Sequence, residues 1–358
     1  MSDQMEYGSF EAAQEKSNAI EKDIPIHPER YRVLTGDRPT GRLHIGHLFG
    51  SLQNRVRLSR LGVTTYIVIA DYQVLTDRDT FEAIAENTRE LTIDYLAVGI
   101  KPGANTHIFP HSHVPELNQL LLPFLTLVTN AELNRNPTVK EEIAASGMKN
   151  ITAGMYTYPV HQAADILFCK GNTVPVGKDQ LPHLELTRVI ARRFNERFAA
   201  GKPVFPEPQA LLSAAPTILG LDGGQKMSKS RGNAIMLCAD EDETTSLIKK
   251  AKTDAERLIS YDPEKRPEVS NLLLIASLCT GEKPAEIAAR IGEKGAGALK
   301  RHVTEALNEY LRPMRAERAR LEADPAYIRS VLVQGIESAR ATAIATLQEV
   351  RAAMHMEL

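Results

Sequence analysis

Apolar residues in the first part of the chain fall into short, β-branched runs separated by longer stretches with helical spacing. A continuous apolar run of about four to eight residues is typical of a buried strand, and apolar residues every three or four positions indicate an amphipathic helix. Strands are expected at 31–34, 64–70, 106–110 and 173–176, and helices at 48–61, 80–98, 115–128, 160–167 and 181–198. This alternation predicts an α/β fold with a doubly wound, parallel, Rossmann-like sheet.

The pattern changes near residue 240, where strand-like runs give way to amphipathic helices. The expected helices are 241–252, 269–279, 284–291, 298–321 and 327–354. Within the fourth helix, one apolar stripe is interpreted as core and not as a partner surface. It consists of Leu299, Val303, Leu307, Leu311 and Met314. We therefore predict a Rossmann-like domain at 29–239, which includes the 226–230 loop, and an all-helical C-terminal domain at 240–358.

Two stretches have weaker patterns. Residues 1–28 are polar and carry six acids against two lysines, a net charge of −4, which leaves +2 for the remainder of a chain of net charge −2. We expect this acidic N-terminal extension to be disordered or loosely attached. Residues 136–155, which contain Gly147 and Gly154, are predicted to form a surface loop or a mobile wall of a pocket.

Composition excludes several classes of protein. No apolar run approaches the ~20 residues needed to cross a membrane, and no signal-peptide core is visible at the N-terminus. Cys169, Cys238 and Cys279 are far apart and form no C-x-x-C pair. A disulfide framework or a zinc site is therefore not expected. We predict a cytoplasmic protein with no metal held by its own side chains and no contact with a membrane.

The strongest local signal is the Gly-rich turn at 35–47, which contains His-Ile-Gly-His and joins the first expected strand to a helix. In an open α/β sheet, such a turn lies at the carboxyl end of a strand, where ligands bind. Gly41 and Gly46 let the backbone approach a ligand, and His44 and His47 can add donors or positive charge. The turn therefore suits a polyphosphate, although a Gly-rich strand-to-helix turn alone is a weak signal.

Three later segments carry candidate chemistry. Lys-Met-Ser-Lys-Ser at 226–230 follows two glycines, although alone it would be interpreted as a solvated basic turn. Asp165 lies on an apolar helix face with Tyr158 and Gln162, where a carboxylate needs a partner, and a structural hydrogen bond or ion pair is the simpler interpretation. Asp179 and Gln180 follow a strand end and suit hydroxyl or ammonium recognition, although Asp179 equally suits a helix N-cap.

In this order and about one domain apart, the His-Ile-Gly-His and Lys-Met-Ser-Lys-Ser segments resemble the class I aminoacyl-tRNA synthetases. Further segments resemble the tryptophanyl-tRNA synthetases, closer to their divergent second bacterial type, and the match runs from about 31 to 351. These segments are Tyr158-Pro159 with 163–167, 174–180 followed by His183 and 185–188, and 261–263 with 269–273. The resemblance implies an aminoacyl-tRNA ligase that forms tryptophanyl-adenylate from ATP and L-tryptophan and transfers tryptophan to tRNA(Trp).

The resemblance also implies roles for individual residues. Asp165 would accept a hydrogen bond from the indole N–H, Tyr158 and Gln180 would hold the α-ammonium, and Gln162 would complete the tryptophan pocket. His44, His47, Lys140, Lys226 and Lys229 would be catalytic. The ATP-binding residues would be Arg38, Pro39, Thr40, Gly46, His47, Gly177, Lys178, Asp179, Ile218, Lys226, Met227, Ser228, Lys229 and Ser230. Mg²⁺ would accompany ATP, residues 240–358 would bind the anticodon, and the protein would be a homodimer.

Some positions depart from the family pattern and keep alternatives open. Arg38 stands where Gln is usual, Tyr72-Gln73 where Gln-His is common, and Gln162 where an apolar residue is common. A Gln three residues before the Asp is also found in tyrosyl-tRNA synthetases, so tyrosine is the alternative substrate. A small nucleotidyltransferase could share the first motif but not the second. A non-catalytic, synthetase-like binding or regulatory paralogue is the non-enzyme alternative.

Overall fold

The computed structural model describes residues 10–76, 81–146, 151–199, 201–212 and 217–357. Among these, five parallel strands form one sheet in the order β3-β2-β1-β4-β5. The strands are β1 Arg32–Asp37, β2 Thr64–Ile69, β3 Thr106–Pro110, β4 Thr173–Val176 and β5 Gln209–Leu212. The order reverses direction between β1 and β4, which makes this point the topological switch of a doubly wound sheet. The predicted fold class is confirmed.

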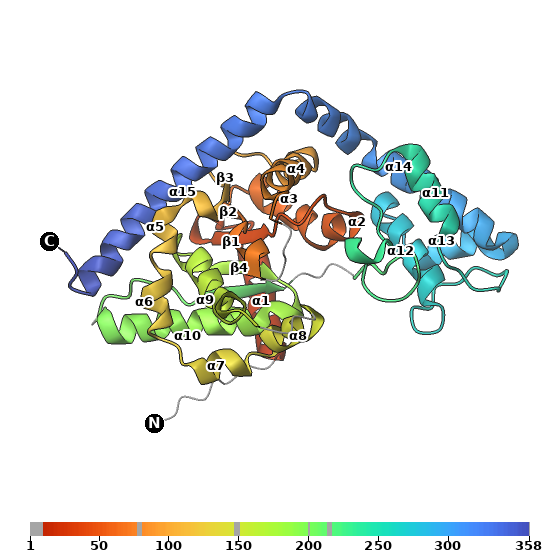
Figure 1. The fold of residues 1–358 in the computed structure, drawn as a ribbon. Helices are drawn as coiled ribbons and strands as arrows, with labels where there is room; N and C mark the ends of the chain where they lie inside the picture. Colours follow the sequence, from red (N-terminus) through yellow and green to blue (C-terminus); the bar gives the residue numbers. More distant parts are fainter. Residues whose placement is uncertain (1–9, 77–80, 147–150, 200, 213–216, 358) are drawn as a thin grey trace.

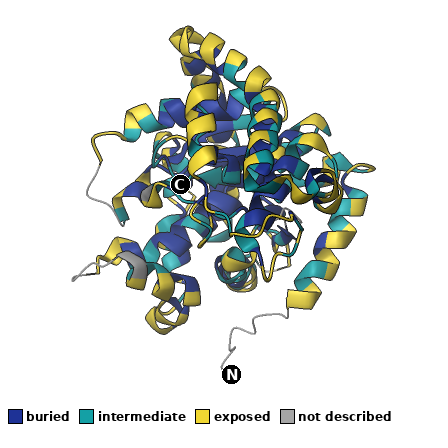
Figure 2. Cartoon of the chain, turned by 90° about the vertical axis from the view of Figure 1, so that its right-hand side faces the viewer, coloured by how far each residue is buried: buried dark blue, intermediate teal, exposed yellow. Residues whose placement is uncertain are grey.

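Helices cover both faces of the sheet because its strands are buried on both sides (Figure 1). Along β2, Ile67 and Ile69 belong to one apolar cluster, whereas Tyr66 and Val68 belong to another. This alternation is the two-residue period of a strand whose faces both pack against helices. Figure 2 shows the buried residues gathered around the sheet and the exposed residues on the outer faces of the helices.

The first part of the chain forms more helices than the five that the sequence predicts. They are α1 Phe10–Asp23, α2 Ile45–His47, α3 Gln53–Arg60, α4 Ile84–Ala97, α5 Pro115–Asn118, α6 Leu121–Leu125, α7 Asn130–Arg135, α8 Pro137–Ser146, α9 Ala153–Leu167 and α10 Leu181–Phe198. A π-helical turn, η2 (Leu48–Leu52), joins α2 to α3. The expected helix at 115–128 is divided into α5 and α6, and β5 was not predicted. Residues 80 and 147–150, included in two expected segments, lie outside the described residues.

The expectation of a loosely attached N-terminal extension is wrong for residues 10–23. These residues form α1, which packs against β5, and the hydroxyl of Ser17 accepts a hydrogen bond from the backbone N–H of Leu212 at 2.8 Å. Ile24 is fully buried with Val33 and Leu211. A few well-placed apolar side chains are therefore enough to dock this acidic segment on the sheet. Residues 1–9 lie outside the described part.

The polar stretch expected to be a loop at 136–155 is also different. Residues 137–146 form α8, and a capping box of Thr129 and Glu132 begins the preceding helix α7. α9 begins at Ala153, before Pro159, because the side chain of Thr152 caps its first turn. A proline inside a helix removes one backbone donor and crowds the carbonyl four residues before it, and here the cap at Thr152 and the burial of Pro159 offset that cost.

The C-terminal helices agree closely with the expected pattern. They are α11 Glu241–Lys250, α12 Pro267–Thr280, α13 Pro284–Ile291, α14 Gly295–Glu322 and α15 Pro325–Ala353. In the apolar stripe of α14, Leu299, Val303, Leu307 and Leu311 are fully buried and Met314 is partly buried, so the interpretation as core is confirmed. None of the helices in the described part is long and apolar enough to cross a membrane.

α15 leaves the other C-terminal helices and lies along β3 and α5 (Figure 1). A Cβ atom added at Gly335 would lie only 1.9 Å from the carbonyl oxygen of Ile108. Only glycine therefore permits this approach of helix to strand. Tyr66 and Thr342 share a hydrogen bond of 2.8 Å at the same contact. The last helix thus packs on the sheet and shares its apolar core.

Candidate active site

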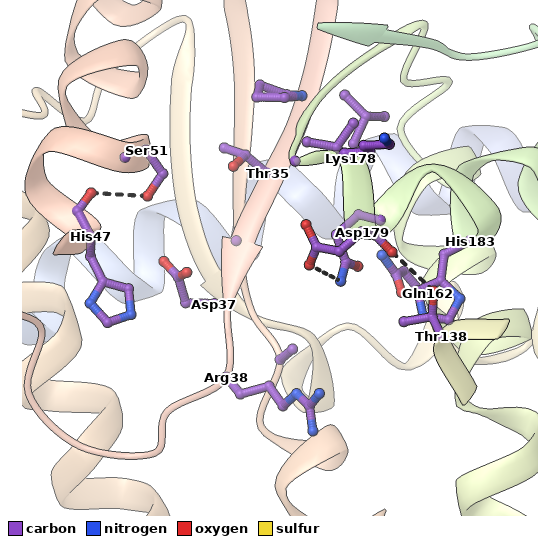
Figure 3. Close-up of a pocket in the computed structure, with 18 of the residues that line it drawn as sticks. Thr35, Asp37, Arg38, His47, Ser51, Thr138, Gln162, Lys178, Asp179 and His183 are labelled. Carbon is purple, nitrogen blue, oxygen red and sulfur yellow. Dashed lines mark hydrogen bonds between the residues drawn. The ribbon is translucent and has the colours of Figure 1, made fainter. Parts of the chain in front are cut away.

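A cavity of about 1040 Å³ opens at the carboxyl ends of β1 and β4. This is the topological switch of the sheet, where the connections leave on opposite sides and create a crevice for ligands. Figure 3 shows Thr35, Asp37 and Arg38 at the end of β1, with His47 on one side and Asp179 on the other. The sheet therefore brings the two Gly-containing turns of the sequence into one site.

The His-Ile-Gly-His turn is fixed by hydrogen bonds between its own residues. Nδ1 of His44 accepts from the backbone N–H of Gly46 at 3.1 Å, and Nδ1 of His47 accepts from the backbone N–H of His44 at 3.3 Å. In a neutral imidazole with Nδ1 as acceptor, Nε2 carries the proton. The two rings, with centroids 3.8 Å apart, therefore have their Nε2–H groups as donors.

The two histidines are not cationic. Burial, together with the nearby His47, Lys229 and Lys226, lowers the pKa of His44 to about 3. Burial likewise lowers the pKa of His47 to about 4, although the carboxylate of Asp37 opposes the shift. The expectation that these rings could add positive charge is therefore wrong at neutral pH. They can offer an anion hydrogen bonds but no charge.

Asp37, at the end of β1, forms a buried charge cluster that the sequence did not reveal. Its carboxylate lies 2.5 Å from Nη1 of Arg55 and accepts from the hydroxyl of Tyr95 at 2.6 Å. Burial alone would raise its pKa, but Arg55 outweighs burial and the pKa of Asp37 falls to about 2. Nη2 of Arg55 also donates to the carbonyl of Gly36 at 3.1 Å. This cluster holds the strand end beneath the cavity.

The lysine loop docks directly against the histidine turn. The N–H of Ile45 donates to the carbonyl of Ile235 at 3.0 Å, and the N–H of Leu237 donates to the carbonyl of Leu43 at 2.9 Å. A Cβ atom on Gly46 would lie 3.6 Å from the Cβ of Met227. Two motifs separated by about 180 residues in the sequence thus form one wall of the cavity.

The two lysines of the loop differ in position. Lys226 lines the cavity, as do Met227 and Ile218. Lys229 does not, because its ammonium donates to the carbonyls of Gly41 at 3.1 Å and Thr40 at 3.3 Å. The N–H of Ser228 donates to Oδ1 of Asn233 at 2.9 Å. Ser230 lies in the short 3₁₀ turn η6 (Lys229–Arg231), and its side chain is outside what the structure describes.

The opposite wall comes from β4, α9 and α10. The hydroxyl of Tyr158 lies 2.9 Å from Nε2 of His183, and burial lowers the pKa of His183 to about 4. The side-chain amide of Gln180 donates to the carboxylate of Asp179 at 3.2 Å (Figure 3). The hydroxyl of Thr138 donates to the backbone carbonyl of Asp179 at 2.9 Å. Asp179 is therefore not a simple N-cap, since no such side-chain bond is formed there.

Lys178 also belongs to this wall and reaches the N-terminal helix. Its ammonium lies 5.0 Å from the centroid of the Phe10 ring, a cation–π distance. Lys178 itself lines the cavity. The N-terminal segment thus contacts a residue of the candidate site, which the acidic composition of that segment did not suggest.

Asp165 meets both of the interpretations given to it. It lines the cavity, and its Oδ1 lies 2.9 Å from Nδ1 of the fully buried His111. The carboxylate therefore has a structural partner behind it and still faces the cavity. His111 was missed because it follows β3 and lies 54 positions away from Asp165 in the sequence.

Arg38 and Lys140 are placed differently from each other. Arg38 lines the cavity, and its guanidinium forms an ion pair of 3.1 Å with Glu142 on α8. Lys140 lies on the same helix, but it is exposed and does not line the cavity. On this helix, Glu142 therefore reaches the cavity and Lys140 does not.

Taken together, most of the candidate residues meet at one cavity. Those that line it are Arg38, His44, Gly46, His47, Tyr158, Gln162, Asp165, Gly177, Lys178, Asp179, Gln180, Ile218, Lys226 and Met227. Those that do not line it are Pro39, Thr40, Lys140, Ser228, Lys229 and Ser230. Lining residues that the sequence reasoning missed include Thr35, Asp37, Arg55, Gln73, Thr138, Glu142 and His183.

Comparison with known proteins shows which family the chain belongs to. The family described as tRNA synthetases class I (W and Y) matches residues 27–312. The tryptophan–tRNA ligase of Treponema pallidum is 42% identical over 331 residues, covering 90% of this chain and 96% of that protein. The tryptophan–tRNA ligase of Clostridium longisporum is 42% identical over 333 residues, covering 91% and 97%.

A solved structure gives the same result. The tryptophanyl-tRNA synthetase of Campylobacter jejuni, complexed with ADP and tryptophan, aligns with a TM-score of 0.79 at 30% identity, covering 90% of this chain and 99% of that one. Sequence family, full-length relatives and fold therefore agree. The chain belongs to the class I tRNA synthetases for tryptophan and tyrosine and, within them, to the tryptophan–tRNA ligases.

Proposed function

We propose that this protein activates L-tryptophan with ATP and transfers the tryptophanyl group to tRNA(Trp). The observation that carries the proposal is the single cavity at the sheet switch, where the histidine turn, Lys226 and Asp165 meet. Relatives about 40% identical over nine tenths of the chain are tryptophan–tRNA ligases, which supports an aminoacyl-tRNA ligase.

On the ATP side, the Nε2–H groups of His44 and His47 would donate to phosphate oxygens, and Gly46 would let the adenine approach the backbone. The segment Gly177, Lys178 and Asp179 would contact the ribose. Because the imidazoles are neutral, the positive charge that the protein offers to the leaving phosphates would come from lysines. Lys226 already lines the cavity, and Lys229 would join it by moving with the loop.

On the tryptophan side, Asp165 would accept from the indole N–H, and Tyr158 with Gln180 would hold the α-ammonium. Gln162 also lines this part of the cavity. The buried partners of Asp165 and Tyr158, which are His111 and His183, support precise placement of both groups. Precise placement matters because the reaction needs orientation more than it needs a nucleophilic side chain.

In the reaction, a carboxylate oxygen of tryptophan attacks the α-phosphorus of ATP. The bond to the bridging oxygen breaks, and pyrophosphate leaves with its electron pair. Mg²⁺ would enter as part of the magnesium–ATP substrate, because nucleotide sites hold this ion largely through phosphate oxygens and water. A terminal ribose hydroxyl of the tRNA then attacks the carbonyl carbon of the adenylate, and AMP leaves.

The remaining assignments belong to the same proposal. Residues 240–358 would contact the tRNA anticodon, and the protein would act in the cytoplasm as a homodimer. Lys140 and Ser230 are proposed contacts of the phosphates once the surrounding segments close over ATP. The ion pair between Arg38 and Glu142 would have to open for Arg38 to reach ATP, since Glu142 holds it at 3.1 Å.

The test is amino-acid-dependent exchange of pyrophosphate into ATP, with tryptophan and tyrosine assayed side by side in the absence of tRNA. Exchange with tryptophan alone is expected, followed by charging of a tRNA(Trp) transcript. Exchange with tyrosine would establish the tyrosyl alternative, and the absence of exchange with either would favour a binding paralogue. The chain has no tryptophan residue, so fluorescence of bound L-tryptophan gives an independent measure of binding.

A further inference from the structure

Behind Asp165 lies a histidine that touches no substrate in the proposed reaction. His111 is the first residue after β3, it is fully buried, and it does not line the cavity. Its Nδ1 lies 2.9 Å from Oδ1 of Asp165, and its Nε2 accepts from the backbone N–H of Tyr72 at 3.1 Å. With Nε2 as an acceptor, Nδ1 carries the proton and donates to Asp165.

The far side of the ring is also fixed. Oδ1 of Asp71 lies 3.4 Å from Nε2 of His111, and it accepts from the backbone N–H groups of Tyr72 and Ser112, each at 3.1 Å. Burial lowers the pKa of His111, but the carboxylates of Asp165 and Asp71 together outweigh burial and raise the pKa above its ordinary value. The interaction of His111 with the two carboxylates is therefore favourable despite complete burial.

A second histidine holds the plane of the first. The rings of His111 and His161 meet edge to face, with centroids 4.6 Å apart. Nε2 of His161 lies 2.6 Å from Oδ1 of Asn118, whose Nδ2 donates to the carbonyl of His111 at 3.1 Å. His111 therefore cannot turn without breaking contacts with three different elements.

A metal ion is the other chemistry that these side chains could support. Ligand atoms of His111, His161 and Asp165 lie within 4.8 Å of one another. However, both ring nitrogens of His111 and one nitrogen of His161 already form hydrogen bonds within the described residues. An ion would have to replace these bonds, so the geometry favours a hydrogen-bonded chain that ends at Asp165.

We propose that His111 is a positioning residue that determines selectivity for a substrate ring bearing an N–H donor. It holds Oδ1 of Asp165, so that Oδ2 is left to accept from that N–H in the cavity. This inference rests on the proposed function. A ring of the same shape without the donor would leave Oδ2 without its partner, and an unpaired buried acceptor is costly. The His111–Asp165 pair thus favours a substrate ring with an N–H donor over a ring of the same shape that lacks it.

The test compares two substrates in pyrophosphate exchange: tryptophan, and β-(3-benzothienyl)alanine, in which sulfur replaces the indole N–H. The ratio of their kcat/KM values does not depend on the fraction of active enzyme. The natural protein should prefer tryptophan by about tenfold or more. In His111→Leu this preference should fall to about one, mainly through a higher KM for tryptophan.

Two further variants make the result specific. His111→Asn keeps an N–H donor near the position of Nδ1 and should retain most of the preference, even if His111→Leu folds poorly. His113→Leu, an exposed histidine in the same short turn, should leave both kcat/KM values unchanged. Equal losses for both substrates in His111→Leu, or an unchanged ratio, would overturn the role of His111. Exchange of tyrosine in place of tryptophan by the natural protein would instead overturn the proposed function.

Discussion

At the scale of single residues, the histidine turn separates hydrogen bonding from charge. His44 and His47 use Nδ1 to fix the backbone around them, and burial keeps both rings neutral. A neutral N–H group can donate a hydrogen bond to a phosphate oxygen, but it attracts free anions less strongly than a charged imidazolium would. Among the side chains of the protein, lysines are therefore the groups that would stabilise the negative charge of the leaving phosphates. This assignment can be tested separately.

Replacement of Lys229 by alanine is predicted to lower the rate of pyrophosphate exchange by ~10²-fold or more, because the loss removes preorganised charge near the leaving phosphates. The melting temperature should change little, since the ammonium of Lys229 donates to backbone and side-chain oxygens of the 40–41 turn and pairs with no carboxylate in those bonds. Lys250→Ala, an exposed lysine on α11, is the control and should exchange at the natural rate. Unchanged kinetics in Lys229→Ala would remove this lysine from the mechanism.

At the scale of elements, a buried charge cluster joins α14 to α4 and to the histidine turn. The guanidinium of Arg318 bonds to the carboxylates of Glu90 and Asp94, and all three side chains are buried. Oδ2 of Asp94 in turn accepts from the backbone N–H of Leu43 at 2.8 Å. Burial raises the pKa of Asp94 to about 6, although Arg318 opposes the shift. The C-terminal helices thus contact the residue that precedes His44.

Arg318→Met is predicted to lower the free energy of unfolding by about 3–5 kcal/mol, because it leaves the buried carboxylate of Asp94 without its cation. Glu90 keeps its ion pairs with Arg42 and Arg89. Urea denaturation followed by circular dichroism measures the change. Arg320→Met is the matched control, since this arginine lies on the same helix with an exposed side chain that contacts Glu317 and the ring of Tyr327 at the surface. An equal effect of the two substitutions would contradict the assigned importance of the buried cluster.

The sequence predicted the elements whose patterns are local. The bounds of α10 and α13 agree with the expected helices because their apolar spacing is regular and proline begins each of them. β5 could not be predicted, since its four residues become a strand only by pairing with β4 and packing against α1. α8 could not be predicted either, because its polar composition lacks a clear apolar face.

The same division holds in the candidate site. The motif residues were visible because they are close together in the sequence, as in His-Ile-Gly-His. Their partners were not, because His111 reaches Asp165 across 54 positions and Glu142 reaches Arg38 across 104 positions. Such pairs form only when the fold brings a strand end together with a helix that is distant in the sequence. Lys229 shows the converse, since a motif residue can lie outside the cavity wall.

At the scale of the whole molecule, buried neutral histidines make stability depend on pH. The folded-state pKa values of His44, His47 and His183 are about 3, 4 and 4, below the ordinary value of 6.5. The unfolded chain therefore takes up protons below pH 6.5 that the folded chain does not. Their contribution to stability is complete above pH 6.5 and is lost as the pH falls, at about 1.4 kcal/mol per pH unit for each histidine.

This dependence can be isolated with His183→Gln. Urea denaturation at about pH 7.5 and about pH 5.5 should give a smaller acid loss in the variant than in the natural protein, by about 1.4 kcal/mol for the one pH unit below the ordinary pKa. The comparison cancels the other titrating groups, including His111, whose pKa shifts in the opposite direction. Identical pH dependence in the two proteins would show that the pKa of His183 is the same in the folded and unfolded states, which would contradict its burial as a neutral ring.

The position of α15 has a consequence for biosynthesis. Ala339, Ala343, Leu347 and Val350 cover the face of the sheet that carries Phe109. During translation at about 5–20 residues per second, β3 leaves the ribosome on the order of 10–45 s before the helix that covers it. The nascent chain therefore carries an uncovered apolar sheet face throughout this interval. Folding of the sheet domain can therefore be completed only after α15 has been synthesised. The sheet domain and the C-terminal helices do not fold independently of each other.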